Sequence, residues 1–224
     1  MKCPTSAAEN SHKIKMIIRE QITGLVLAGG RGMRMGQVQK GLQHLHGEPM
    51  LNHVLQRLQN QVGPIMINAN QDIARYAEFS YPVIEDVIDG YAGPLAGIHA
   101  GLLRCKTPYL VSAPCDSPFL PRDLVQNLSL ALIENQAQLA VVTTLDNESA
   151  PAQMRAQPVF SLMESALAPH LQNFLENGGR KVSAWYASLR VVQVAFNDAT
   201  SFRNINTLAE LAYYNQTPPS TSVE

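Results

Sequence analysis

Four of the eight residues at positions 29–36 are glycines, and they directly follow the apolar run 22–28. Glycine allows positive φ and a close approach to a ligand, so successive N–H groups there can form a concave nest for phosphate oxygens. Arg31 and Arg34 lie within this segment and Lys40 follows it. These cations can neutralise a triphosphate and the charge that develops on an attacked phosphorus. The pattern predicts a triphosphate-binding loop, with a purely structural turn as the alternative.

Two common phosphate-binding motifs do not fit this loop. A dinucleotide-binding fingerprint beginning at Gly30 and Gly32 needs glycine at position 35, where the chain has Met35. A Walker A loop needs a Gly-Lys dipeptide, and the sequence contains none. Both motifs depend on those residues for close contact with phosphates. The loop therefore disfavours a Rossmann oxidoreductase and a P-loop nucleotidase.

Asp116 follows a predicted strand and lies between Pro114 and Pro118, which stiffen its loop. A hard carboxylate suits Mg²⁺, which usually takes one or two protein carboxylates together with phosphate oxygens and water. Asp116 is therefore a candidate metal ligand, and an Asx turn or a helix cap is the alternative. Its neighbour Cys115 could be a nucleophile or a small buried residue at the strand end.

The segment at positions 84–97 combines acidic residues with glycines after a predicted strand. Asp86 can accept hydrogen bonds from a base edge or a ribose. Gly93 and Gly97 flank a helix start at Pro94, where the backbone can approach a ligand closely. Asp86 and Gly93 are therefore candidate nucleotide-binding residues.

Two pairs of asparagines also lie next to predicted strands or helices, where a ligand could bind. Asn68 and Asn70 come after the second predicted strand, and Asn204 and Asn206 precede the last predicted helix. Amides both donate and accept hydrogen bonds, so one residue of each pair could read a base or a ribose. The other could equally form a turn or a helix cap.

These residues follow segments whose apolar runs predict strands. The predicted strands are 22–28, 64–68, 82–84, 109–113, 139–143, 159–163 and 189–194, and the predicted helices are 49–61, 72–79, 94–105, 121–135, 165–176, 181–187 and 207–213. Pro158 favours an edge position for the strand 159–163. The alternation predicts an α/β fold, a single-domain Rossmann-like three-layer sandwich whose mostly parallel sheet has helices on both faces. Ligands in such sheets bind beyond the carboxyl ends of the strands.

The overall composition is that of a globular protein. The 224 residues suit one domain, which we expect at 21–214, with a flexible extension at 1–20 and a flexible tail at 215–224. The formal net charge of −1 gives no field for binding nucleic acid. Three widely spaced cysteines without a C-x-x-C pair disfavour a disulfide framework or a zinc site. Without a signal-peptide pattern or a long apolar run, we expect a cytoplasmic protein without membrane partners.

Several of these segments, in the same order along the chain, resemble the MobA-like nucleotidyltransferase family, and within it the molybdenum cofactor guanylyltransferases. The matching segments cover about positions 22–211, and they are residues 27–36 with 40–42, 68–70, 83–86, 93–97, 114–116 and 204–207. The resemblance implies transfer of GMP from GTP to molybdopterin, with release of pyrophosphate and with Mg²⁺ as cofactor. It implies as partners GTP, molybdopterin or Mo-molybdopterin, other cofactor-biosynthesis proteins and molybdoenzyme chaperones.

The resemblance also implies roles at individual positions. The residues implied to contact the nucleotide are Leu27, Ala28, Gly29, Gly30, Asn68, Asp86 and Gly93. Arg34 and Lys40 would bind its phosphates and, with the Mg²⁺ ligand Asp116, form the catalytic set. The residues implied on the pterin side are Arg180, Asn204 and Asn206.

Two positions depart from the family pattern. The residue before Lys40 is Gln39, where aspartate is common, and Gln157 stands where histidine is common. Either difference could mean a relaxed or different acceptor. The alternatives to guanylyl transfer are a sister enzyme that uses CTP, another nucleotide or another phosphorylated acceptor, and a non-catalytic nucleotide-binding protein.

Overall fold

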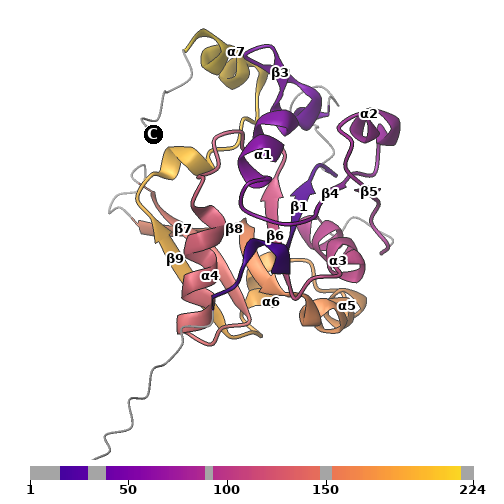
Figure 1. The fold of residues 1–224 in the computed structure, drawn as a ribbon, viewed down its shortest axis with the longest axis vertical. Helices are drawn as coiled ribbons and strands as arrows, with labels where there is room; N and C mark the ends of the chain where they lie inside the picture. The colour runs from indigo at the N-terminus through magenta and orange to yellow at the C-terminus, as the bar shows by residue number, and fades with distance from the viewer. Residues whose placement is uncertain (1–15, 30–38, 89–92, 147–152, 218–224) are drawn as a thin grey trace, which may run out of the picture.

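The computed structural model describes residues 16–29, 39–88, 93–146 and 153–217. Within them, seven strands form one sheet in the order β5-β4-β1-β6-β8-β7-β9, with helices on both faces (Figure 1). The strands are β1 (Ile22–Leu27), β4 (Ile65–Asn68), β5 (Val83–Ile84), β6 (Tyr109–Pro114), β7 (Leu139–Asp146), β8 (Gln153–Glu164) and β9 (Val191–Phe196). All pairings are parallel except those of β8 with β6 and β7. The predicted α/β fold with a mostly parallel sheet is confirmed.

The helices fall into two layers. They are α1 (Met50–Leu58), α2 (Ile73–Ala77), α3 (Pro94–Arg104), α4 (Leu124–Glu134), α5 (Ala168–Glu176), α6 (Val182–Tyr186) and α7 (Leu208–Gln216). Successive strand residues point to opposite faces, so in β1 Val26 joins the core under α1 and α4, whereas Leu25 joins the core under α3, α5 and α6. Because both faces are covered, the central strand β1 is buried at five of its six residues.

Short elements complete the fold. They are the 3₁₀ turns η1 (Arg19–Gln21), η3 (Lys40–Leu42), η4 (Ser165–Leu167) and η5 (Ala199–Phe202), and the hairpin of β2 (His44–Leu45) with β3 (Glu48–Pro49). A small core, formed by Leu45, Met50, Ile205 and Leu211, joins α7 to this hairpin and to α1. The extension and the tail predicted at 1–20 and 215–224 lie mostly outside the described residues.

The edge position predicted for the strand at 159–163 is wrong, because β8 lies inside the sheet between β6 and β7. The register shifts from Val141 opposite Ser161 to Val142 opposite Gln157, so Pro158 lies in a β-bulge. The ladder needs no N–H at a bulged residue, so proline is tolerated there. The Pro158 carbonyl instead accepts a hydrogen bond of 2.6 Å from the Tyr186 hydroxyl.

In the part of the chain that the structure describes, no helix combines the length and the apolar character needed to cross a bilayer.

Candidate active site

The carboxyl ends of β1, β4, β5 and β6 meet along one edge of the sheet, where most of the predicted site residues lie. Three backbone hydrogen bonds continue the sheet past the strand ends. Ala28 N donates to Asn68 O at 2.8 Å, Ala69 N to Ile84 O at 3.0 Å and Cys115 N to Leu27 O at 3.0 Å. The segments that follow these strands therefore begin side by side, as expected for a parallel sheet.

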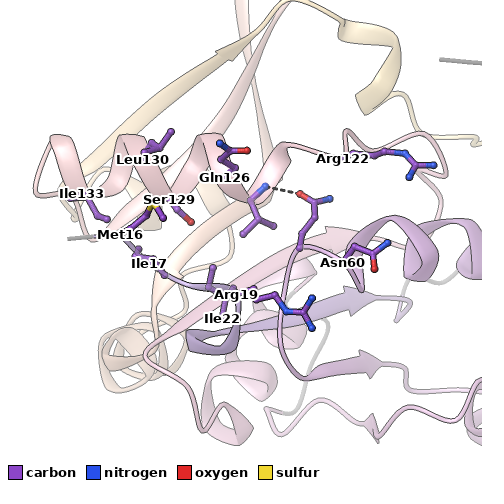
Figure 2. A pocket seen from close by; sticks show the side chains of 12 residues that line it. Met16, Ile17, Arg19, Ile22, Asn60, Arg122, Gln126, Ser129, Leu130 and Ile133 are labelled. Atoms are coloured by element: carbon purple, nitrogen blue, oxygen red, sulfur yellow. Dashed lines mark hydrogen bonds between the residues drawn. The ribbon is translucent and has the colours of Figure 1, made fainter. Parts of the chain in front are cut away.

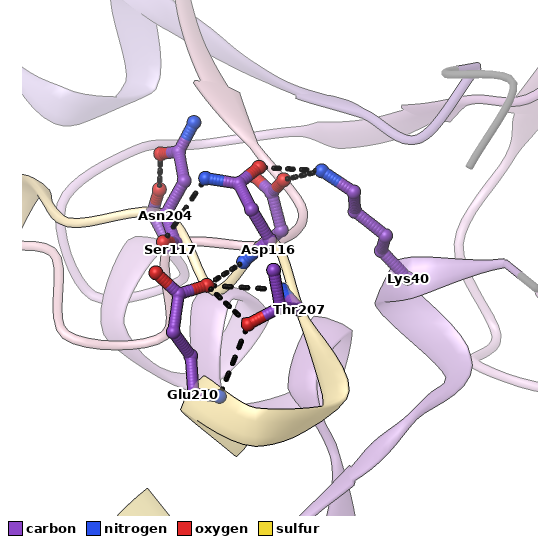
Figure 3. Close-up of polar contacts among 7 residues, drawn as sticks. Lys40, Asp116, Ser117, Asn204, Thr207 and Glu210 are labelled. Carbon is purple, nitrogen blue, oxygen red and sulfur yellow. Dashed lines mark hydrogen bonds and ion pairs between the residues drawn. The ribbon is translucent and has the colours of Figure 1, made fainter. Parts of the chain in front are cut away.

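Lys40 and Asp116 lie beside each other at this edge (Figure 3), and Asn206 joins them. The Lys40 Nζ atom lies 2.9 Å from Asp116 Oδ2 and 2.7 Å from Asn206 Oδ1. The Lys40 and Asp116 side chains are 23% and 11% exposed, so the pair is only partly shielded from water. Three segments far apart in the sequence thus supply one cation, one carboxylate and one amide.

A glycine allows η3 to approach Asp116. A Cβ atom at Gly41 would lie 3.1 Å from both the Cβ and the Sγ of Cys115, a distance tighter than most real contacts. The absence of a side chain at Gly41 thus brings the preceding Lys40 beside Asp116. Cys115 itself is buried, and this burial, with the Asp116 charge as a second cause, raises the pKa of its thiol far above the ordinary value. Since the thiolate is the nucleophile, the structure favours the buried small residue over the nucleophile.

The segment at positions 204–206 is attached directly to the Asp116 loop. Ile205 N donates to Asp116 O at 2.9 Å, and Ser117 Oγ donates to Asn204 Oδ1 at 2.5 Å. Asn204 therefore holds the loop beside Ser117 (Figure 3), whereas the Asn206 side chain accepts from the Lys40 ammonium. Sequence reasoning missed Ser117, and only the tertiary contact reveals its part.

A second polar cluster surrounds Asp86. Its two carboxylate oxygens accept separate hydrogen bonds, Oδ1 from Asn68 Nδ2 at 2.9 Å and Oδ2 from Asn70 Nδ2 at 2.8 Å. Asp86 N also donates to Asn70 Oδ1 at 2.9 Å, so Asn70 contacts this residue at two points. The two amides fix the orientation of the carboxylate, which keeps lone pairs for further donors.

Glycines also surround this second cluster. A Cβ atom at Gly29 would lie 2.9 Å from Asn70 Nδ2, so the start of the glycine loop packs against the cluster. Gly93 has φ +62° and ψ −149°, a conformation that glycine adopts readily, directly before Pro94 at the start of α3. The structure therefore places Leu27, Ala28 and Gly29 at the end of β1 beside the Asp86 cluster, whereas Gly30, Arg31 and Arg34 lie outside the described residues.

Arg180 is not joined to these clusters. It lies between α5 and α6, and its Nη1 donates to Leu175 O at 2.8 Å and to Gly179 O at 2.7 Å. Its hydrogen bonds are thus local to the end of α5.

The two positions that depart from the family pattern lie in different surroundings. Gln39 is buried, and its Nε2 donates to Gln71 Oε1 at 2.9 Å, while Tyr76 Oη donates to Gln39 Oε1 at 3.5 Å. Gln157 Nε2 donates to Thr144 Oγ1 at 3.0 Å. Gln39 therefore supports the backbone before Lys40, whereas Gln157 lines a cleft beside Asn204 and Asn206.

A cleft of about 780 Å³ opens beside Asn204 and Asn206. Its lining comes from the end of β7, from the first half of β8, from η5 and the segment after it, and from α7. Six of its lining residues are Thr144, Arg155, Gln157, Asn204, Asn206 and Glu210. A second pocket, of about 290 Å³, lies between the segment before β1, the end of α1 and α4 (Figure 2). Its lining residues do not include Lys40, Asp116 or Asn206. The larger cleft is the one that adjoins the cluster of candidate residues.

Comparison with known proteins identifies the family of this chain. The profile of the MobA-like NTP transferase domain matches residues 24–191. The chain is 54% identical over 197 residues to a molybdenum cofactor guanylyltransferase of Ralstonia nicotianae, covering 88% of this chain and 97% of that protein. A protein of the same name from Bordetella pertussis is 50% identical over 196 residues, which cover 88% of this chain and 98% of that protein.

Solved structures share the fold. The molybdopterin-guanine dinucleotide biosynthesis protein A of Archaeoglobus fulgidus superposes with a TM-score of 0.69 at 23% identity, over 87% of this chain and 97% of that chain. A 4-diphosphocytidyl-2C-methyl-D-erythritol synthase of Anaerococcus prevotii gives a TM-score of 0.67 at 14% identity, over 88% of this chain and 95% of that chain. From the sequence profile and the relatives of 50% identity or more, we conclude that this chain belongs to the MobA-like NTP transferase family and is a nucleotidyltransferase.

Proposed function

We propose that this enzyme transfers GMP from GTP to the terminal phosphate of molybdopterin, forming the guanine dinucleotide cofactor and releasing pyrophosphate. The single observation that carries the proposal is the Lys40–Asp116–Asn206 cluster between the Asp86 cluster and the cleft of about 780 Å³. The names of the relatives of 50–54% identity supply the substrate class.

The Asp86 cluster supports guanine as the base. The Watson–Crick edge of guanine carries two neighbouring N–H donors, and a carboxylate offers two acceptor oxygens. Asn68 and Asn70 already orient both oxygens, so little reordering is needed when the base arrives. Leu27, Ala28, Gly29 and Gly93 would contact the nucleotide with their backbones, and Gly30 belongs to the same proposal.

Asp116 fits a magnesium ion that arrives with the triphosphate. Mg²⁺ is usually held by one or two carboxylates together with substrate phosphates and water. Over the described ranges, no group of three or more His, Cys, Asp or Glu residues forms a cage for a resident metal. We therefore propose that Asp116 holds Mg²⁺, which when bound adds positive charge to the phosphate oxygens as a Lewis acid.

The reaction itself needs positioning and charge neutralisation rather than a protein nucleophile. An oxygen of the acceptor's phosphate monoester forms a bond to the α-phosphorus of GTP. The bond from that phosphorus to the bridging oxygen breaks, and pyrophosphate leaves with the electron pair. Lys40 would neutralise charge on the α-phosphate, and we propose that Arg34 does the same from the glycine loop.

The cleft supports an acceptor with polar ring edges and a phosphate. Asn204 and Asn206 would line the pterin side, and Arg155 adds a cation to the same wall. We also propose that Arg180 binds the acceptor phosphate. The hydrogen bonds of Arg180 go to Leu175 O and Gly179 O and do not join it to the cleft. A cytoplasmic location and exchange with other cofactor-biosynthesis proteins and molybdoenzyme chaperones belong to the same proposal.

The test is to incubate the enzyme with molybdopterin, Mg²⁺ and each of the four nucleoside triphosphates, and to follow pyrophosphate. We expect release with GTP, and a loss of about 10²–10³-fold in Lys40→Ala and Asp116→Asn. Lys106→Ala, an exposed lysine before β6, is the matched control and should retain wild-type rates. Rates within threefold of wild type in either site variant would refute the assignment.

Other outcomes of the same experiment identify the alternatives. Release with CTP or ATP in place of GTP would indicate a sister enzyme. Tight GTP binding without pyrophosphate release in any mixture would indicate a non-catalytic nucleotide-binding protein.

A further inference from the structure

We infer that Glu210 is a positioning residue for the Lys40–Asp116 pair and acts on it through Asn206. This inference rests on the proposed function, since it concerns the same pair. One oxygen of the Glu210 carboxylate accepts hydrogen bonds from the backbone N–H groups of both Asn206 and Thr207.

Glu210 and Thr207 form a capping box at the start of α7. Thr207 is the N-cap residue and its hydroxyl accepts from Glu210 N at 3.1 Å, while Glu210 Oε2 accepts from Thr207 N at 2.9 Å. A capping box ordinarily satisfies these two donors. Glu210 and Thr207 are shown in Figure 3, and the same Oε2 atom also accepts from Asn206 N at 2.8 Å. The carboxylate thus holds the residue outside the helix as well as the helix end.

Asn206 passes this constraint on to the lysine. Its Oδ1 lies 2.7 Å from Lys40 Nζ, while Asp116 Oδ2 lies 2.9 Å from the same ammonium. An ammonium has three donors on a flexible four-carbon stem. Two donors are taken by Asn206 and Asp116, which leaves the third for a phosphate oxygen. The direction of that third N–H therefore depends on where Asn206 is held.

Apart from the contact with Lys40, three hydrogen bonds among the described residues attach residues 204–206 to the rest of the protein. Of these three, the one with Glu210 comes from α7. Ile205 N binds Asp116 O, and Ser117 Oγ binds Asn204 Oδ1, so residues 204 and 205 are held by the Asp116 loop. Asn206 N binds Glu210 instead. Removing the carboxylate should therefore release the backbone of Asn206, while the attachments of Asn204 and Ile205 stay in place. The Asn206 side chain would then keep its own hydrogen bond of 3.3 Å, from Nδ2 to Asn204 O.

The Glu210 side chain keeps its charge for this task. The N–H of Asn206 is the largest cause that lowers the pKa of this carboxyl below the ordinary value, followed by the Thr207 hydroxyl and N–H. Glu210 is therefore an ionised acceptor at neutral pH, and hydrogen bonds to a charged acceptor are stronger than neutral ones.

The test compares the rate of pyrophosphate release in Glu210→Ala, Glu210→Gln, Asn206→Ala and the double variant Asn206→Ala/Glu210→Ala. We expect Glu210→Ala to lower kcat about tenfold, the size expected for one hydrogen bond to a charged group, with the KM for GTP within threefold of wild type. Glu210→Gln retains an acceptor oxygen and should recover most of kcat. Because both residues act on Lys40 by one route, the double variant should be no slower than Asn206→Ala alone.

The matched control is Ala212→Gly, an exposed change within α7 that weakens the helix without touching Asn206 N. We expect it to lower Tm while leaving kcat within twofold of wild type. An equal loss of kcat in Ala212→Gly and Glu210→Ala would overturn the inference, because Glu210 would then act only through helix stability. Multiplying losses in the double variant would overturn it as well.

A measurement without substrate separates this inference from the proposed function. If wild-type enzyme releases no pyrophosphate with any nucleotide, the proposed function fails. A crystal structure of Glu210→Ala still tests the positioning. Loss of the Lys40–Asn206 hydrogen bond is the expected result, and an unchanged Lys40 Nζ position with both contacts intact would overturn it.

Discussion

Gly97 of α3 lies so close to Asn68 at the end of β4 that a Cβ atom on Gly97 would overlap the Asn68 Oδ1 atom. The same Cβ would also lie 2.7 Å from Leu27 Cδ2. Asn68 is 2% exposed, so its side chain has little room to move away. The small size of Gly97 therefore allows Asn68 to bind Asp86.

The first prediction is that Gly97→Ala weakens nucleotide binding. The new methyl group must displace the Asn68 side chain, and Asp86 then loses the hydrogen bond of 2.9 Å to Oδ1. We expect the Kd for GTP, measured by calorimetry, to rise about tenfold, since a misplaced hydrogen-bond partner costs on the order of 1–2 kcal/mol.

Gly101→Ala is the matched control for this change. It lies on the same helix, and its Cβ would approach Leu25 Cδ2 at 2.6 Å in the core rather than Asn68. It should lower Tm while leaving the Kd for GTP within threefold of wild type. A similar rise of Kd in both variants would mean that α3 packing, not the Asn68 contact, sets the affinity.

The second prediction concerns base selectivity. Asn70→Ala removes the donor to Asp86 Oδ2 and the acceptor of Asp86 N, whereas Asn68 still binds Oδ1. We expect the preference for GTP over ATP in competition binding to fall about tenfold, because the carboxylate loses one of its two orienting amides. Asp86→Asn, which replaces an acceptor oxygen with a donor, should abolish the preference. An unchanged GTP preference in Asp86→Asn would exclude this residue as the base reader.

Much of this site could be predicted from the sequence because it depends on a parallel sheet. Once Asn68, Asp86 and Asp116 were placed after strands, they had to share one edge, whatever the order of those strands. The capping box of Thr207 and Glu210 is also a local pattern that can be read from spacing. Its link to Lys40 could not be predicted, since Asn206 is 166 residues away in the sequence.

The errors have equally physical causes. Pro158 indicates an edge strand only where the ladder is regular, and the bulge opposite β7 removes that condition. The strands β7 and β8 are longer than the predicted strands 139–143 and 159–163. The additional residues include the exposed Leu145 and Met154, so they show no pattern of buried apolar residues. The effect of Gln39 on the acceptor stays a prediction. The buried contacts of Gln39 with Gln71 and Tyr76 could not be foreseen, because they depend on tertiary packing that spacing does not reveal.

The third prediction concerns His99, which is 2% exposed and whose two ring nitrogens have no hydrogen-bond partner within the described ranges. Burial lowers the pKa of this imidazole, and the Glu176 charge opposes that effect only in part. The folded state therefore holds a neutral ring, whereas the unfolded chain takes up a proton below about pH 6.5. Wild-type stability should fall as the pH drops from there towards the folded pKa.

His99→Leu should remove this dependence. The variant leaves no unpaired ring nitrogen in the core, so its free energy of unfolding should equal or exceed the wild-type value at pH 7.5, by up to about 1–3 kcal/mol. Its advantage should grow at pH 5.5, where the unfolded wild type gains a proton. Urea unfolding of both proteins at the two pH values measures this, and parallel pH dependence would contradict the assignment to His99.

The fourth prediction is that the Cys115 thiol takes no part in the reaction. The residue is 7% exposed, and burial next to Asp116 raises the pKa of its thiol, so the thiolate is scarce at neutral pH. We expect Cys115→Ala to retain the wild-type rate of pyrophosphate release within threefold, with a lower Tm because the contact with Gly41 is partly lost. Iodoacetamide at pH 7.5 should modify the partly exposed Cys105 before Cys115. An inactive but folded Cys115→Ala enzyme, or a covalent nucleotide on Cys115 in mass spectra, would instead establish the thiol as a nucleophile and would replace direct transfer by a two-step reaction.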